Sequence, residues 1–267
     1  MVEALRAYGL LVRMWTRAAW QYPASLILMT VSQALITLMD LAMVGVLFSQ
    51  VDALAGFGLR EVLFLYGTAY LAFGLADLAV GNVDLLGYRI RMGTFDSMLV
   101  RPASTLVQVA AEDFSPRRVA VLLQGLVVLG VSLPMVPVDW DGTRVLVLVG
   151  MVLSGAVIFG AIRVLSAALL FLINDVAEVI SAFTYGGNML TQYPLAVYGQ
   201  QALRVLTWVV PLGFVNWYPA LYVLDRPDPL GLPPALQFAS PVVALILVLL
   251  ARAAWQGGVR RYRSTGN

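Results

Sequence analysis

DLLGYRIRMGTFDSMLVRPASTLVQVAAEDFSPRR, residues 84–118, is the densely charged stretch that decides the fold of this chain, because the sequence on both sides of it is built from apolar runs. Of the 267 residues, 60% are hydrophobic and 12% are charged. Soluble domains carry about 25% charged residues. The sequence therefore predicts an all-α, polytopic membrane protein in which this stretch lies in water between two spans.

The composition excludes several kinds of chemistry. The chain has no cysteine and no histidine, and all 17 of its basic residues are arginine. It therefore has no thiolate or imidazole metal site, and no Walker A lysine to hold a nucleotide. We expect no metal and no cofactor on this chain, no enzymatic activity of its own and no nucleic-acid partner. Its surroundings are the lipid bilayer.

Two parts are predicted along the chain. Residues 1–23 place Arg6, Arg13 and Arg17 on one side of a helical wheel and end at Pro23, which is typical of an amphipathic helix in the membrane interface. An ordinary cytoplasmic flank of the first span is the alternative. Residues 24–267 form a single transmembrane domain.

Seven apolar runs are long enough to cross the membrane, but the distribution of arginines is incompatible with an odd number of crossings. They cluster near both ends of the chain and in residues 84–118, so the positive-inside rule places all three regions in the cytoplasm. An even number of crossings follows. Six spans are predicted, at about 24–50, 62–84, 119–138, 145–172, 178–193 and 236–255.

The weakest of the seven runs, 205–224, is predicted not to cross. Proline and glycine interrupt it, and broken helix at membrane depth survives only inside protein or beside a cavity. We interpret residues 194–224 as an outer re-entrant helical hairpin before the last span. The residues that shape it are Pro194, Pro211, Gly213, Asn216 and Pro219.

A short helix is predicted within the cytoplasmic segment 85–118. Thr94 suits its N-cap, Asp96 its first turn and Arg101 its last turn, while Pro102 ends it. A short, capped, amphipathic helix can lie parallel to the membrane and present a compact surface to the cytoplasm. A loop that merely joins two spans is the alternative.

One face of this helix is apolar. Phe95, Met98 and Leu99 share that face by their i, i+3 and i+4 spacing.

Asp40, Asp77, Asp84 and Arg163 are charged residues that fall within the predicted spans. Such residues mark function or pairing, because a charge at membrane depth is costly. Asp77 and Arg163 have similar depths, so we expect them to pair, with Asp84 as a rival partner for Arg163. Snorkelling of Arg163 to the cytoplasmic interface is the alternative. Asp40 has no partner that the sequence identifies.

Two motifs carry a resemblance to a known family. Residues 90–102, IRMGTFDSMLVRP, and residues 210–220, VPLGFVNWYPA, resemble segments of bacterial ABC transporter permeases of the type-2, exporter-like class, in its subgroup of about 260 residues. The resemblance implies six spans with both termini inside, an amphipathic amino-terminal helix, a cytoplasmic coupling helix between spans 2 and 3, and an outer hairpin before span 6.

The resemblance also implies partners. Two permeases, identical or homologous, would pair in the bacterial inner membrane, and each coupling helix would dock on a separately encoded ABC ATPase that holds ATP and Mg. The expected ATPase contacts are Arg91, Thr94, Phe95, Asp96, Met98, Leu99, Arg101 and Pro102.

The function implied is ATP-driven export of a hydrophobic or amphipathic substrate. An ion-coupled secondary transporter or channel, with Asp40 and Asp77 as ion or proton sites, is the alternative. It predicts matching broken helices in the two halves, and the sequence has one broken segment.

Overall fold

The fold was obtained as a computed structural model, which describes residues 23–111, 117–173 and 177–263, together with residues 9, 13, 14 and 21. The predicted amphipathic helix over residues 1–23 lies almost wholly outside this range. The regular elements described are all helical. In chain order they are α2 (Pro23–Phe48), α3 (Leu59–Val80), η1 (Gly81–Leu85), α4 (Leu86–Arg91), α5 (Thr94–Leu99), α6 (Thr105–Ala111), α7 (Arg117–Ser132), α8 (Gly142–Leu169), α9 (Ala177–Thr191), η2 (Leu195–Tyr198), α10 (Gly199–Trp208), η3 (Leu212–Phe214), α11 (Trp217–Val223), η4 (Pro234–Phe238) and α12 (Ser240–Arg261).

Four stretches of the described chain are long and apolar enough to cross a membrane: α2, Leu59–Arg91 (α3 with its continuation), α8 and α12. α7 and α9, with 16 and 15 residues, are shorter. At 1.5 Å per residue α7 is about 24 Å long, against about 30 Å of hydrocarbon. The second predicted span also ends differently, because α3 runs through η1 into α4 and ends at Arg91 rather than at residue 84.

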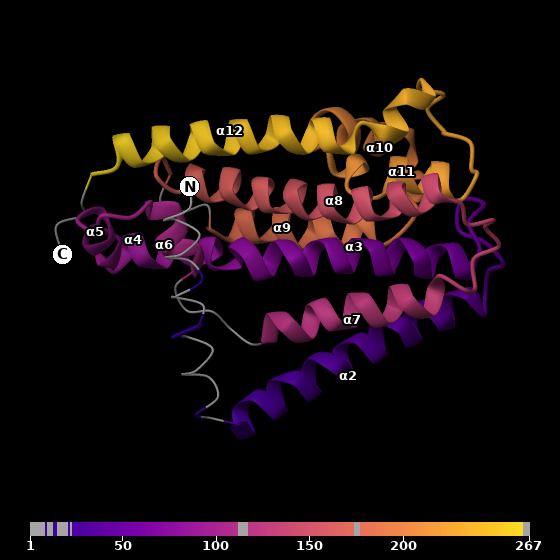
Figure 1. Ribbon diagram of the computed structural model, residues 1–267, viewed down its shortest axis with the longest axis horizontal. Helices are drawn as coiled ribbons and strands as arrows, with labels where there is room; N and C mark the ends of the chain where they lie inside the picture. Colours follow the sequence, from indigo (N-terminus) through magenta and orange to yellow (C-terminus); the bar gives the residue numbers. More distant parts are fainter. Residues whose placement is uncertain are drawn as a thin grey trace.

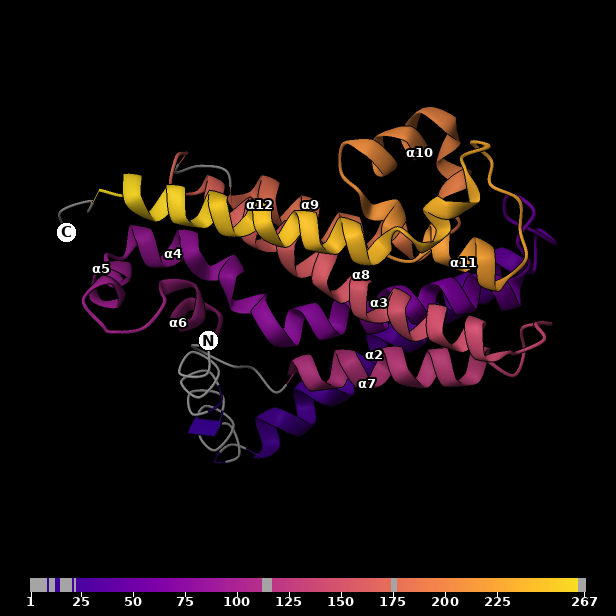
Figure 2. The same cartoon turned by 45° about the horizontal axis from the view of Figure 1, so that its top comes forward.

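The long helices form an elongated bundle with different elements at its two ends (Figure 1). α4, α5 and α6 lie at one end, near the last turns of α12, and α10 and α11 lie at the other (Figures 1 and 2). We call these the α5 end and the hairpin end.

α3 is the central helix and packs against both α7 and α8. Glycines allow the α3–α7 approach: a Cβ on Gly67 would lie 2.7 Å from the backbone nitrogen of Leu129, and one on Gly125 would lie 2.6 Å from that of Leu71. Small residues at helix contacts are the usual means of close packing in membranes.

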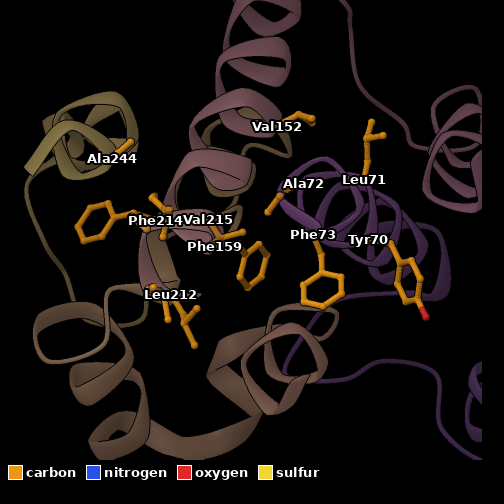
Figure 3. Close-up of a cluster of buried hydrophobic side chains, with 14 of the residues drawn as sticks. Tyr70, Leu71, Ala72, Phe73, Val152, Phe159, Leu212, Phe214, Val215 and Ala244 are labelled. Carbon is orange, nitrogen blue, oxygen red and sulfur yellow. The ribbon is translucent and has the colours of Figure 1, made fainter. Parts of the chain in front are cut away.

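The core continues from α3 to α8 and η3. Figure 3 shows Phe73 of α3 facing Phe159 of α8, with Phe214 of η3 toward α12; Leu212 of η3 lies against Gly187 of α9, 3.2 Å from a Cβ built there. The Phe73 and Phe159 rings meet edge to face, with centroids 5.5 Å apart. The broken stretch of the chain is therefore part of the packed interior.

Candidate functional site at the α5 end

A buried charge cluster lies where α3 passes into η1. Arg163 of α8 is fully buried, and its Nη1 lies 2.9 Å from Oδ1 of Asp77 and 2.8 Å from Oδ2 of Asp84. Arg118 of α7 reaches Asp77 with its Nε, 3.4 Å from Oδ2. Two arginines and two aspartates make the cluster neutral, which lowers the cost of placing charges at membrane depth.

Neighbouring groups complete the cluster. The Arg163 guanidinium lies over the Phe73 ring, 4.6 Å from its centroid, which suits a cation. Arg118 Nη2 donates to Asn82 Oδ1 at 2.8 Å, and Asn82 Nδ2 donates to the carbonyl of Ala110 at 3.1 Å. The cluster thus links α3, η1, α6, α7 and α8.

Gly81 leaves room for the ion pairs where the two aspartates converge. A Cβ there would contact Asp77 Oδ1 and would lie 2.8 Å from Cζ of Arg118. Any side chain at this position would displace the charged groups of Asp77 and Arg118, so glycine here keeps the ion pairs in place.

α5 is attached to the bundle by aromatic side chains. The Phe95 ring lies 5.3 Å from that of Phe171, which follows α8, and 5.0 Å from that of Tyr262, which follows α12. Phe171 also meets Trp255 of α12 at 5.3 Å, and Trp255 Nε1 donates to Thr105 Oγ1 at 3.1 Å. We call Phe95, Phe171, Trp255 and Tyr262 the aromatic cluster.

Polar contacts close the same region. Burial raises the pKa of Tyr262 to about 12, and the neighbouring Asp96 adds to the shift. Gln108 Nε2 donates to the carbonyls of Met98, at 3.0 Å, and Ala103, at 2.9 Å, which ties α6 to the chain leaving α5. The α5 segment is therefore anchored along its inner side.

The broken stretch at the hairpin end is held by hydrogen bonds. Asn216 Nδ2 donates to the carbonyls of Leu65, at 3.1 Å, and Thr191, at 2.9 Å. A Cβ on Gly213 would lie 2.9 Å from Cε2 of Tyr218, so only glycine fits there without movement.

The prolines of this stretch sit where a missing N–H is tolerated. Pro194 and Pro211 precede η2 and η3, and Pro219 lies in the first turn of α11. The structure thus forms two short helices, α10 and α11, separated by a break at the predicted residues.

One of the comparisons with known proteins gives a match. A family model described as ABC-2 family transporter protein matches residues 34–266, which include the charge cluster, the α5 segment and the broken stretch. The chain belongs to the ABC-2 transporter family. No curated protein and no solved structure gave a match. As a member of this family, the chain is a multi-pass membrane component of a transport system.

The intramembrane ion pair was predicted in part. The structure of the ABC-2 protein confirms the Asp77–Arg163 pair, and Asp84 binds the same nitrogen instead of competing for it. The snorkelling alternative for Arg163 is wrong, because this side chain is fully buried. Arg118 was missed, since by sequence it resembled any other arginine flanking a span.

A short helix, α5, is present at the predicted position, but its details differ. Gly93 is the N-cap, with a left-handed φ of 68°, while Thr94 Oγ1 donates to the carbonyl of Arg89 at 3.3 Å. α5 ends at Leu99, so Arg101 and Pro102 lie beyond it and Arg101 is not in its last turn.

The predicted partner surface also changes. Phe95 and Met98 are buried within the chain, so they anchor α5 and do not face a partner, whereas Leu99 is exposed and does not share their environment. Val100, which the sequence did not single out, is 83% exposed. The outward residues of the predicted set are Arg91, Thr94, Leu99, Arg101 and Pro102.

Asp40 has a neighbour that the sequence did not identify. The hydroxyl of Tyr66 donates to Asp40 Oδ2 at 3.5 Å, and the Tyr66 ring stacks on that of Tyr70, with centroids 5.0 Å apart. No basic side chain within the described ranges forms an ion pair with Asp40. Those ranges also contain no group of three or more metal-ligating side chains.

Proposed function

We propose that this chain is the transmembrane subunit of an ATP-driven exporter in the bacterial inner membrane. A separately encoded ABC ATPase dimer binds ATP and Mg, and a second permease, identical or homologous, completes the transport path. Membership of the ABC-2 family supports this function. The absence of lysine from the chain agrees with a nucleotide site on another polypeptide.

The observation that carries the proposal is that the α5 segment is packed against the bundle on one side and exposed on the other. Its inner side is locked onto the ends of α8 and α12 through the aromatic cluster, while Val100 and Arg101 beside it face outward. A partner that moves the exposed side therefore moves two long helices, because packed side chains transmit displacement instead of absorbing it. An ATPase that binds the exposed side of α5 could therefore drive movement of α8 and α12.

The proposed topology has six crossings with both termini in the cytoplasm. The α5 end gathers Arg89, Arg91, Arg101, Arg260 and Arg261, and the exposed carboxylates of the described residues belong to loops at the hairpin end. This asymmetry supports a cytoplasmic α5 end. α7 and α9 complete the six crossings if the bilayer thins locally around them, which costs little per ångström of mismatch.

A hydrophobic or amphipathic substrate is proposed for the exporter. Apolar side chains along α2, such as Met39 and Met43, are exposed, and the turns at the hairpin end are too short to form a capture domain for a polar cargo. The ion-coupled alternative loses one of its two sites, because Asp77 is occupied by Arg163 and Arg118.

Co-purification with the ATPase tests the docking surface. The partner to co-express is a P-loop ATPase without spans, sought first among the products of the neighbouring genes. We expect Val100→Asp and Arg101→Glu each to lower ATPase recovery at least tenfold, because both change the exposed side of the segment. Arg144→Glu, at the hairpin end, is the control with unchanged recovery. Full recovery with both α5 variants would remove the proposed contact.

A second variant separates docking from force transmission. Phe95→Leu keeps an apolar side chain but removes the ring contacts with Phe171 and Tyr262. We expect the ATPase to bind normally while substrate-stimulated ATP hydrolysis falls. Unchanged stimulation would show that the aromatic cluster does not carry the movement.

Cysteine labelling tests the orientation, because the natural chain has no cysteine. Ser97→Cys reports the α5 end and Gln201→Cys the hairpin end, and both positions are exposed. An impermeant maleimide should label only Gln201→Cys in intact cells and only Ser97→Cys in inverted vesicles. The reverse pattern contradicts the topology.

A further inference from the structure

An apolar groove runs along the side of the bundle between α3, α8 and α12. It has a volume of about 430 Å³, and α6 contributes Leu106 to its lining. On α8 its lining extends from Ala156 to Val164, which corresponds to about 12 Å of helix. We call it the α12 groove.

Small side chains create the α12 groove. Ala76 and Ala79 of α3 face Gly160 and Ala161 of α8 across it, so no large side chain fills the space between the helices. A Cβ on Gly160 would already lie 3.3 Å from Cγ2 of Val80. The walls carry hydrocarbon, which matches an acyl chain and gives a polar solute no hydrogen-bond partner.

Arg252 supplies the one charged side chain of the groove lining. It lies one helical turn before Trp255, whose Nε1 binds Thr105 Oγ1, so the arginine sits at the α6 end of the groove. Arg252 is exposed, and no carboxylate of the described residues forms an ion pair with it. An exposed arginine within an apolar helix needs an anion or water for its guanidinium.

We propose that the α12 groove binds one acyl chain of an anionic phospholipid, whose phosphate pairs with Arg252. The hydrocarbon walls and the cation at one end match the two parts of such a lipid. The inference does not depend on the ATPase or on the direction of transport.

A second copy of the chain fits this groove less well. It would bury Arg252 and would have to supply a carboxylate at the same level. The exposed carboxylates of residues 23–111, 117–173 and 177–263 lie in loops at the hairpin end, at Asp52, Asp139, Asp141 and Asp225. A lipid phosphate satisfies Arg252 without any such residue.

Quenching by brominated lipids tests the proposal on the full chain in vesicles. A single cysteine at Val157, which lines the groove and is 43% exposed, carries a fluorophore, and one at Val127 of α7, 64% exposed, reports ordinary lipid contact. Brominated phosphatidylglycerol and brominated phosphatidylcholine are compared at the same mole fraction in phosphatidylcholine vesicles. The measured quantity, at each labelled position, is the binding constant of brominated phosphatidylglycerol divided by that of brominated phosphatidylcholine.

We expect this ratio to be about five at Val157→Cys, from one arginine facing an anionic head group, and near one at Val127→Cys. Arg252→Gln should lower the ratio at Val157→Cys to near one, while Arg252→Lys should retain most of it. Arg260→Gln, an exposed arginine further along α12, is the matched control and should leave it unchanged.

Three results would overturn the proposal. The first is a ratio near one at Val157→Cys when Arg252 is present, and the second is a ratio that Arg252→Gln does not change. The third is that neither brominated lipid quenches at Val157→Cys while both quench at Val127→Cys, which would show that protein covers the groove.

Discussion

α2 and α3 follow one another in the chain and look alike by hydropathy, yet they occupy opposite environments. In the most apolar window of each candidate span, 11% of the α2 residues are buried, against 78% in the span that contains α3. α3 approaches α7 closely through Gly67, whereas a Cβ on Gly45 of α2 would meet nothing within 4 Å. Hydropathy identifies a helix that suits a membrane, and small residues at the contact decide how closely it packs.

The aspartates of the two helices differ in the same way. Asp77 of α3 forms ion pairs with Arg163 and Arg118, while Asp40 of α2 has the hydroxyl of Tyr66. A carboxylate within a packed helix is tied to its counterions.

The largest expected effect comes from removing the counterion of α3. Arg163→Met should lower the free energy of unfolding by about 3–5 kcal/mol, because it leaves Asp77 and Asp84 buried without their shared cation. Chemical unfolding in mixed micelles measures it. Adding Asp84→Asn should recover part of the loss by restoring neutrality. A double variant no more stable than Arg163→Met would show that charge balance does not stabilise the cluster.

Next in size is a methyl group at the α3–α7 contact. Gly67→Ala should cost about 1–3 kcal/mol in the same measurement, since the new Cβ would meet the backbone of Leu129. Gly45→Ala makes the same chemical change in open space and should stay within about 0.5 kcal/mol of the parent. Equal losses in both would contradict the difference in packing.

A smaller effect is expected at the aspartate of α2. Asp40→Asn should cost less than about 1 kcal/mol, because it weakens one long hydrogen bond from Tyr66 and breaks no ion pair of the described residues. Tyr66→Phe should cost a similar amount. A loss as large as that of Arg163→Met would reveal a strong partner for Asp40.

The smallest effect is expected on the exposed side of α2. Met39 is 71% exposed, so Met39→Ala should change the free energy of unfolding by no more than about 0.5 kcal/mol. If a second permease covers this side of α2, the same substitution should weaken the permease pair. Comparing unfolding with pair dissociation, by light scattering at varied concentration, separates the two.

Much of the fold was predictable because hydropathy, proline and arginine are local signals. The apolar helices, the break near Pro211 and the short helix ending before Pro102 follow from residues adjacent in the chain. The Asp77–Arg163 pair was predictable because helical rise converts sequence position into depth.

The other contacts of the site were not predictable in this way. Arg118 and Phe171 gave no local signal, since their partners, Asp77 and Phe95, lie on other elements. The inner side of α5 was mistaken for a partner surface for the same reason. Its apolar spacing is equally compatible with packing on this chain and with packing on another.

The sequence by itself determined that this is an all-helical membrane protein with a polar segment at one end, and that no nucleotide-binding lysine, histidine or cysteine chemistry resides on it. Only the tertiary structure decided which side of α5 is free, how four charges balance around Arg163, and where Arg252 meets an apolar groove. The physical reason is that partitioning into a membrane sums over neighbouring residues, whereas burial and charge pairing depend on which distant residues meet.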